Sequence, residues 1–131
     1  MSPQELVKRA EEAMKLAYTP YSGFQVGAAL LTKDGKVFTG CNIENASYSP
    51  TNCAERTAFF KAVSEGHREF SAIAVVGGQN GVIEGICPPC GVCRQVMSEF
   101  CSSDFLIHLG GKDGEVKTLT LDELLPLRFT L

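Results

Sequence analysis

Hydrophobic residues recur along the chain with helical spacing in some stretches and as short apolar runs in others. The first helical stretch follows Ser2-Pro3-Gln4-Glu5, where Ser caps a helix, Pro occupies its first turn and Glu completes a capping box. One face of this predicted helix is apolar and carries Leu6, Ala10, Ala13, Met14 and Ala17. The pattern indicates a helix that packs on a core and carries no information on chemistry.

The rest of the pattern alternates between strands and helices. Strands are predicted at 24–31, 37–41, 72–76, 105–109 and 116–119, helices at 53–65 and 90–101, and one helical turn at 121–125. Asp34-Gly35 predicts a hairpin between the first two strands, and the stretches 42–52 and 77–89 read as loops. The third and fourth strands flank helix 90–101, so we expect them to run parallel.

This order of elements predicts an α/β fold, a three-layer α/β/α sandwich with a central mixed five-stranded sheet. The chain has 131 residues without a break in composition or a repeat, so we expect a single domain over residues 1–131. Hydrophobic residues are 44% of the sequence and charged residues 21%, which is typical of a globular protein with a buried core.

Charge and hydropathy exclude several classes of partner. The net charge is −3 and no block of Lys or Arg stands out, so a nucleic-acid partner is not expected. No apolar run approaches the roughly 18 residues that a membrane span requires. The residues after Met1 do not resemble a secretory signal, which predicts a cytoplasmic location. There the six cysteines are expected to bind metal or be buried as thiols rather than form disulfides.

Cys53, Cys90 and Cys93 have the spacing of metal ligands. Cys90 and Cys93 are three residues apart and share a face if a helix starts there, and Cys53 opens the other predicted helix. Three thiolates favour zinc and leave its fourth tetrahedral position open for water, which is the arrangement of a catalytic zinc site. Helix N-termini also point N–H groups and partial positive charge at such a site.

Glu55 and Arg56 extend this constellation. Glu55 lies too close to Cys53 to be a fourth ligand with ease, but it can carry protons for a metal-held water. Arg56 is placed to donate a hydrogen bond to the thiolates and offset their charge. Cys53-x-Glu55 followed by Pro89-Cys90-x-x-Cys93 matches the zinc deaminase signature in its three-cysteine form.

Longer motifs give the chain a resemblance to the cytidine deaminases, specifically the small, homotetrameric, single-domain type. The matching stretches are Tyr-Ser-Gly-Phe-Gln-Val-Gly-Ala-Ala-Leu at 21–30, Gly-Cys-Asn-Ile-Glu-Asn-Ala-Ser-Tyr at 40–48, Cys-Ala-Glu-Arg at 53–56, Pro-Cys-Gly-Val-Cys-Arg-Gln at 89–95 and Glu-Leu-Leu-Pro at 123–126. They occur in order and span nearly the whole chain, so chance agreement is implausible.

The resemblance implies zinc-dependent hydrolytic deamination of cytidine and deoxycytidine to the uridine products, with release of ammonia, in pyrimidine salvage. It implies one Zn²⁺ per subunit, held by Cys53, Cys90 and Cys93, whose hydroxide attacks C4 of the base. Glu55 would take a proton from the metal-held water, protonate N3 and later protonate the leaving amine. Such chemistry needs a nucleophile stronger than water and one group that can shuttle protons.

The resemblance also assigns substrate contacts. Asn42 and Glu44 would hold two ribose hydroxyls, and the Glu44 carboxylate would repel a phosphate, so nucleotides are expected to be poor substrates. Phe24 would pack on the pyrimidine, and the Ala54 N–H would face the base carbonyl. The resemblance also implies a homotetramer whose active sites are completed across subunits. The remaining substrate contacts that it implies are Ala46, Tyr48 and Phe129.

Pro88 departs from the family pattern, in which Ser often precedes the Pro-Cys pair; a carbonyl role survives this change and a hydroxyl role does not. Three alternatives stay open from the residues alone. Cys41 could close a four-sulfur structural zinc module with Cys53, Cys90 and Cys93. The chain could deaminate another substrate, such as a blasticidin-S-type antibiotic or cytosine in RNA, or it could only bind a ligand.

Overall fold

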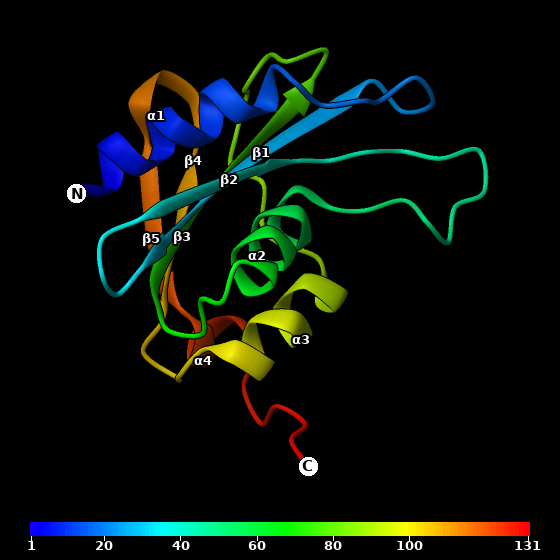
Figure 1. Cartoon of the computed structure of the whole chain (residues 1–131). Coiled ribbons are helices and arrows are strands. Elements are labelled where there is room, and N and C mark those ends of the chain that lie inside the picture. The colour runs from blue at the N-terminus through cyan, green and yellow to red at the C-terminus, as the bar shows by residue number, and fades with distance from the viewer.

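A five-stranded sheet with the strand order β2-β1-β3-β4-β5 forms the middle layer of the molecule (Figure 1). The computed structural model describes residues 1–131. The strands are β1 (Phe24–Thr32), β2 (Val37–Cys41), β3 (Phe70–Gln79), β4 (Leu106–Gly110) and β5 (Val116–Thr120). The helices are α1 (Pro3–Met14), α2 (Ala54–Ser64), α3 (Gly91–Phe100), the four-residue α4 (Leu121–Leu124) and a 3-10 turn (Lys112–Gly114).

The pairing of the strands confirms the predicted mixed sheet. β1 pairs antiparallel with β2 and with β3, and β4 pairs antiparallel with β5. β3 and β4 run parallel, with Ile73 opposite Ile107, because α3 carries the chain across between them. The predicted strand and helix positions agree with the observed ones within about two residues at each end, apart from the two differences described below.

α1 covers one face of the sheet, as its apolar stripe predicts. Ser2 caps it, with the Ser2 hydroxyl accepting a hydrogen bond from the Glu5 N–H at 3.1 Å. Its buried side chains pack on strand residues in a cluster that includes Leu6, Val7, Ala10, Met14, Ala29, Ala72, Ala74 and Val76. Ala17 differs from the prediction, because the helix ends at Met14 and the chain then turns toward Tyr18.

α2 and α3 cover the opposite face, where Phe59 and Met97 are fully buried with Ile73 and Ile107. α2 lies directly on the sheet at Gly40. A Cβ atom at this position would lie 2.5 Å from the Ala54 carbonyl oxygen and 2.6 Å from the Ala58 nitrogen. Only a residue without a side chain permits this contact, so Gly40 sets how deeply the first turn of α2 sits.

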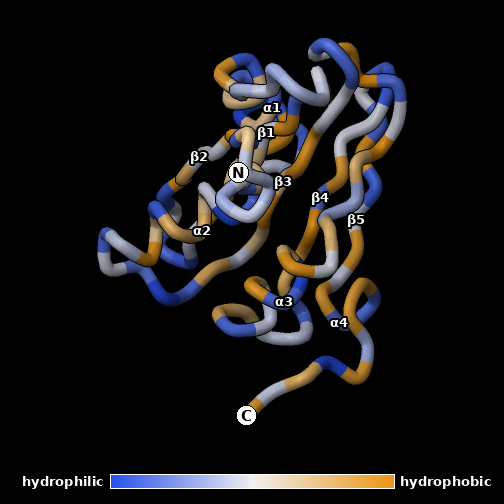
Figure 2. The backbone as a smooth tube through the Cα atoms, turned by 90° about the vertical axis from the view of Figure 1, so that its right-hand side faces the viewer, coloured by the Kyte–Doolittle hydropathy of each residue, from blue (hydrophilic) through white to orange (hydrophobic).

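β3 is longer than the predicted strand at 72–76, and the prediction that a loop begins at Gly77 was wrong. Gly77 and Gly78 continue the ladder opposite Val26 and Gln25. These glycines reflect close approach rather than a turn, because a Cβ at Gly77 would lie 2.9 Å from the Cys87 sulfur. Figure 2 shows much of β3 and β4 in hydrophobic colours, as expected for strands covered on both faces. None of the helices has the length and apolar character needed to cross a membrane.

Candidate active site

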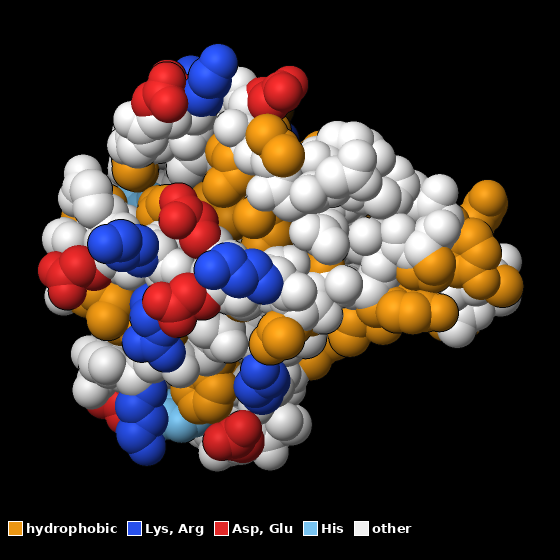
Figure 3. Space-filling model, turned by 90° about the horizontal axis from the view of Figure 1, so that it is seen from above, with side chains coloured by type: hydrophobic (Ala, Val, Ile, Leu, Met, Phe, Trp, Pro, Cys, Tyr) orange, Lys and Arg blue, Asp and Glu red, His pale blue; other side chains and the backbone are white.

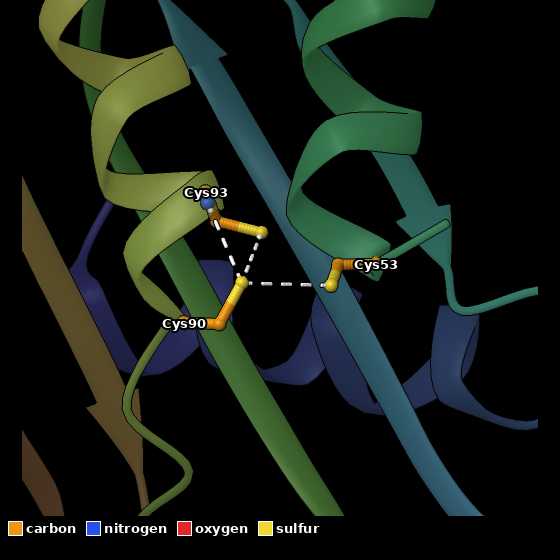
Figure 4. Close-up of side chains that lie close together, drawn as sticks. All are labelled: Cys53, Cys90 and Cys93. Atoms are coloured by element: carbon orange, nitrogen blue, oxygen red, sulfur yellow. Dashed lines mark hydrogen bonds between the residues drawn. The ribbon is translucent and has the colours of Figure 1, made fainter. Parts of the chain in front are cut away.

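Two helix N-termini bring the three predicted ligands together. Cys53 is the N-cap of α2 and Cys90 is the N-cap of α3, both with extended backbone, and Cys93 lies in the first turn of α3. Figure 4 shows the three sulfur atoms pointing toward one another from these helix ends. The Cys53 and Cys90 sulfurs are 3.8 Å apart, the Cys90 and Cys93 sulfurs are 3.4 Å apart, and all three lie within 4.8 Å of one another.

This spacing fits a zinc ion. With Zn–S bonds of about 2.3 Å, tetrahedral geometry places neighbouring sulfurs about 3.8 Å apart, close to the observed distances. The Cys93 N–H also donates to the Cys90 sulfur at 3.4 Å, so the helix terminus itself supports a thiolate. Cys41 is not part of this cluster. The site therefore has three protein sulfurs, and the four-sulfur module that would include Cys41 is not supported.

Charge in the cluster is shared unevenly between the thiols. A hydrogen bond from Cys93, together with the hydrogen bond and positive charge of Arg56, lowers the pKa of Cys53 to about 5. The Arg56 Nη2 donates to the Cys53 sulfur at 3.2 Å, which is the contact that the sequence predicts. The bond with Cys53 and burial together raise the pKa of Cys93.

Glu55 is the only buried carboxylate, with 4% of its surface exposed. Burial, with a smaller contribution from the negative charge of Cys53, raises the pKa of Glu55 to about 7. A carboxyl group with a pKa near neutrality both accepts and releases a proton at physiological pH. Its place beside the sulfur cluster makes Glu55 a candidate proton carrier rather than a helix-capping residue.

A cavity of about 190 Å³ opens onto these groups and contains several predicted substrate contacts. It is lined by Val26, Asn42, Glu44, Thr51, Asn52, Cys53, Ala54, Glu55, Cys87, Pro88 and Cys90. Ala54 is the first residue of α2, where backbone N–H groups have no acceptor within the helix. Sequence reasoning missed the lining roles of Val26, Thr51 and Asn52. The only sequence signal that could have identified Thr51 and Asn52 is their position directly before Cys53.

Asn42 and Glu44 are held in place by backbone groups near the start of β1. The Asn42 Oδ1 accepts from the Val26 N–H at 2.9 Å, and its Nδ2 donates to the Phe24 carbonyl at 2.9 Å. The Glu44 carboxylate accepts from the N–H groups of Tyr21 at 2.9 Å and Ser22 at 3.1 Å. Both side chains are therefore fixed before any ligand arrives.

Phe24 lies next to the cavity rather than in its lining. A Cβ atom at Gly77 would lie 2.9 Å from the Cys87 sulfur and 3.1 Å from the Phe24 ring, so the thiol and the ring occupy the same patch of β3. Cys87 lines the cavity and is not one of the three clustered thiols. Burial raises the pKa of Cys87 to about 11, which keeps it a neutral thiol in the cavity wall.

Ala46, Tyr48 and Phe129 do not line the cavity within one chain. Ala46 is exposed, and Tyr48, with 82% of its surface exposed, borders a neighbouring hollow that shares Glu44 and Thr51 with the cavity. Phe129 is 68% exposed in the C-terminal segment, where its carbonyl accepts a hydrogen bond from the Gln95 side chain at 3.2 Å. These three residues do not contact the sulfur cluster of their own chain.

Comparison with known proteins agrees with this geometry. The family model described as the cytidine and deoxycytidylate deaminase zinc-binding region matches residues 1–109. The chain belongs to the cytidine deaminase family. The curated cytidine deaminase of Halalkalibacterium halodurans is 56% identical over 130 residues, covering 99% of this chain and 96% of that protein. The cytidine deaminase crystal structure from Burkholderia pseudomallei superposes with a TM-score of 0.91 at 50% identity, covering 98% of this chain and 100% of that one.

Membership of the cytidine deaminase family identifies the protein as a hydrolase and the sulfur cluster as its zinc site, with Cys53, Cys90 and Cys93 as ligands. It also confirms the predicted cytidine deaminase-like fold. The family relation extends to a neighbouring activity, because the blasticidin-S deaminase of Bacillus cereus is 36% identical over 131 residues and covers 96% of this chain and 91% of that protein. The substrate must therefore be argued from the cavity.

Proposed function

We propose that this cytidine deaminase hydrolyses cytidine and deoxycytidine to uridine and deoxyuridine, releasing ammonia, as a step of pyrimidine salvage. The observation that carries the proposal is the position of Glu55, a buried carboxyl group in the same cavity as two zinc-ligating sulfurs, Cys53 and Cys90, and the polar side chains of Asn42 and Glu44. A free nucleoside supplies both a base that reacts beside Glu55 and the sulfurs and a sugar that the two polar side chains can bind.

Zinc, when held by the three thiolates, supplies Lewis-acid chemistry and lowers the pKa of a water molecule in the site. Glu55 carries the protons of the reaction. Its carboxylate accepts a proton from the attacking water, delivers it to N3 of the pyrimidine and transfers the next proton to the amino nitrogen on C4. The C4–N bond then breaks, ammonia leaves and the base carries a carbonyl group at C4, so one water is consumed for each ammonia released.

Asn42 and Glu44 are placed to bind the sugar. The amide and the carboxylate line the cavity together and are both held by backbone hydrogen bonds, which reduces the entropy lost when a ligand is fixed. Phe24, whose partly exposed ring lies beside the cavity next to Cys87, offers an apolar surface for the base, and the Ala54 N–H offers a donor for the base carbonyl. These contacts favour a nucleoside over a substrate that lacks a ribose.

The test compares the wild type with Glu55→Gln, which keeps the size of the side chain and removes its proton chemistry. We expect the variant to lose about 10²- to 10⁴-fold in kcat, measured by loss of the cytidine absorbance band, while each chain keeps one zinc. A variant that retains zinc and full activity contradicts the role of Glu55. A wild type that deaminates blasticidin S but not cytidine contradicts the substrate.

We also propose a homotetramer whose active sites are completed by a neighbouring subunit. The loop before β1 and the loop after β2 project from the same side of the molecule (Figure 1). Hydrophobic side chains gather on this projection in Figure 3, where charged groups are sparse. Tyr48 and Phe129 are exposed and do not reach the cavity of their own chain, so a second chain is where they, with Ala46, can contact substrate. Sedimentation of the wild type and of Tyr48→Ser measures the oligomer, and a monomeric, fully active wild type contradicts the proposal.

Two further features complete the proposal. None of the six cysteines is paired in a disulfide, which supports a reducing, cytoplasmic compartment. Cell fractionation tests this, and recovery of the protein outside the cytoplasm contradicts it. The sheet joins strands from both halves of the chain, which supports a single domain over residues 1–131. One cooperative unfolding transition is the expected result for the metal-free protein, and two separate transitions contradict it.

A further inference from the structure

The hydroxyl group of Ser22 connects two residues proposed to bind different parts of the substrate. Ser22 Oγ donates a hydrogen bond to the Oε2 of Glu44 and accepts one from the N–H of Phe24 at 3.0 Å. Glu44 belongs to the proposed sugar contact and Phe24 to the proposed base contact. A single exposed serine therefore sits at the junction of both.

Ser22 is itself fixed by its backbone. Its N–H donates to the Glu44 Oε1 at 3.1 Å, and its carbonyl accepts from the Nε2 of Gln79 at 2.8 Å, at the end of β3. Gly23 follows with a φ of 69°, a left-handed conformation that glycine adopts without strain. The turn is thus anchored to the sheet, and the hydroxyl of Ser22 presents a donor in a defined direction.

We infer that Ser22 is a positioning residue, which holds the Glu44 carboxylate in the orientation that meets a sugar hydroxyl. The inference rests on the proposed function, because it assumes that Glu44 contacts the sugar. It adds a residue that touches no substrate atom itself and acts through Glu44.

The hydrogen-bonding capacity of the carboxylate explains why one hydroxyl matters. An ionised carboxylate has about four acceptor positions. Oε1 of Glu44 already accepts from the N–H groups of Tyr21 and Ser22, and Oε2 accepts from the Ser22 hydroxyl. One position remains, on Oε2, for a sugar hydroxyl. The Ser22 hydroxyl occupies one lone pair of Oε2 and so determines which lone pair is left for the sugar. The two backbone donors bind only Oε1.

The same hydrogen bonds favour the ionised form of the carboxylate. The bond from the Ser22 hydroxyl lowers the pKa of Glu44, and the backbone donors of Ser22 and Tyr21 lower it further. A charged acceptor forms the stronger hydrogen bond with a neutral hydroxyl donor. Loss of the Ser22 hydroxyl should therefore weaken sugar binding without disturbing the sulfur cluster or Glu55.

The experiment compares Ser22→Ala, Ser22→Thr and the wild type, all loaded with zinc, on cytidine and on 2′,3′-dideoxycytidine, which lacks the 2′- and 3′-hydroxyls of the sugar. For Ser22→Ala we expect kcat/KM on cytidine to fall about tenfold, through KM, as for the loss of one hydrogen bond to a charged group. On dideoxycytidine the kcat/KM of Ser22→Ala should stay within about twofold of the wild-type value. Ser22→Thr keeps the hydroxyl and should restore activity, and Ser64→Ala, whose hydroxyl donates to the Lys61 carbonyl, serves as the remote control.

A second measurement covers the case in which dideoxycytidine is turned over too slowly. In a Glu44→Ala background, Ser22→Ala should change kcat/KM on cytidine by less than about twofold, because the group on which it acts is gone. Equal losses on both substrates, a full loss in the Glu44→Ala background, or unchanged cytidine kinetics would each overturn the inference. A wild type that does not deaminate cytidine overturns the proposed function instead, so the two failures are distinguishable.

Discussion

Arg56 and Cys53 lie one helical turn apart at the start of α2, and the Arg56 Nη2 is 3.2 Å from the Cys53 sulfur. Three thiolates and a Zn²⁺ ion carry a net charge of −1, which reduces the metal's pull on its water. A cationic donor to one sulfur withdraws part of that charge and restores the pull. We therefore expect Arg56 to tune the metal through the Cys53 sulfur, without contacting the metal itself.

Replacement of Arg56 by Gln is expected to lower activity and zinc retention together, each by about 10- to 100-fold, the usual cost of losing an outer partner of a metal ligand. Zinc content after dialysis against a chelator and kcat/KM at saturating zinc measure the two effects. Arg68→Gln is the matched control, since the Arg68 Nη1 donates to the Val63 and His67 carbonyls. Equal effects of the two substitutions would argue against the tuning role.

Gly40→Ala is expected to destabilise the protein by about 1–3 kcal/mol, because a methyl group overlaps the first turn of α2. The added Cβ would lie 2.5 Å from the Ala54 carbonyl oxygen. Since α2 carries Cys53, the same shift should weaken zinc binding. Denaturant unfolding and zinc titration measure both quantities. Gly85→Ala, where a Cβ meets nothing within 4 Å, should change stability by less than about 0.5 kcal/mol.

Cytidine monophosphate is expected to be a much poorer substrate than cytidine. Like an ordinary glutamate, Glu44 is ionised at neutral pH, and hydrogen bonds from Ser22 and Tyr21 lower its pKa below the usual value, so its carboxylate repels a phosphate on the sugar. Glu44→Gln removes that charge and should narrow the ratio of kcat/KM between the two substrates, even as both values fall. Comparable turnover of the nucleoside and the nucleotide by the wild type would contradict this expectation.

Acid should destabilise the protein through His108. This histidine is 5% exposed on β4, its Nδ1 lies 2.8 Å from the Thr118 hydroxyl, and burial lowers its pKa from the usual 6.5. Because the folded-state pKa is the lower one, the contribution to stability is complete above about pH 6.5 and decreases as pH falls toward the folded-state value. As the pH falls from 8 to 5, the unfolding free energy of the wild type should decrease more than that of His108→Gln. A difference that does not vary with pH would exclude His108 as the source.

The comparison of sequence and structure separates local signals from long-range ones. The capping box at Ser2 and Glu5 and the Asp34-Gly35 turn act over a few residues, so the elements that they begin or join could be predicted. Cys90 and Cys93 signal a metal by their spacing alone. The continuation of β3 through Gly77 depends on pairing with β1, some fifty positions earlier in the chain, and local composition suggested a loop instead.

The same limit applies to the site. Family motifs led to Asn42 and Glu44, and the structure brings both into the cavity with Glu55. Ser22 lies in the matched segment at 21–30, yet its contact with Glu44 arises only when the turn before β1 folds against the chain after β2. For Cys87 the sequence left burial as a thiol and metal binding both open, and its place in the cavity wall depends on close packing against Gly77.

The close approach of the sulfurs also makes the metal-free protein susceptible to oxidation. Cys90 and Cys93 stand 3.4 Å apart at a helix start, a Cys-x-x-Cys arrangement in which air or peroxide readily couples two thiols. The cation that occupies this position in the working enzyme engages the same lone pairs that an oxidant would attack. Bound zinc therefore protects the thiols from oxidation in addition to its role as a cofactor. Enzyme from which zinc has been removed should be stored anaerobically or with a reductant if it is to be reactivated.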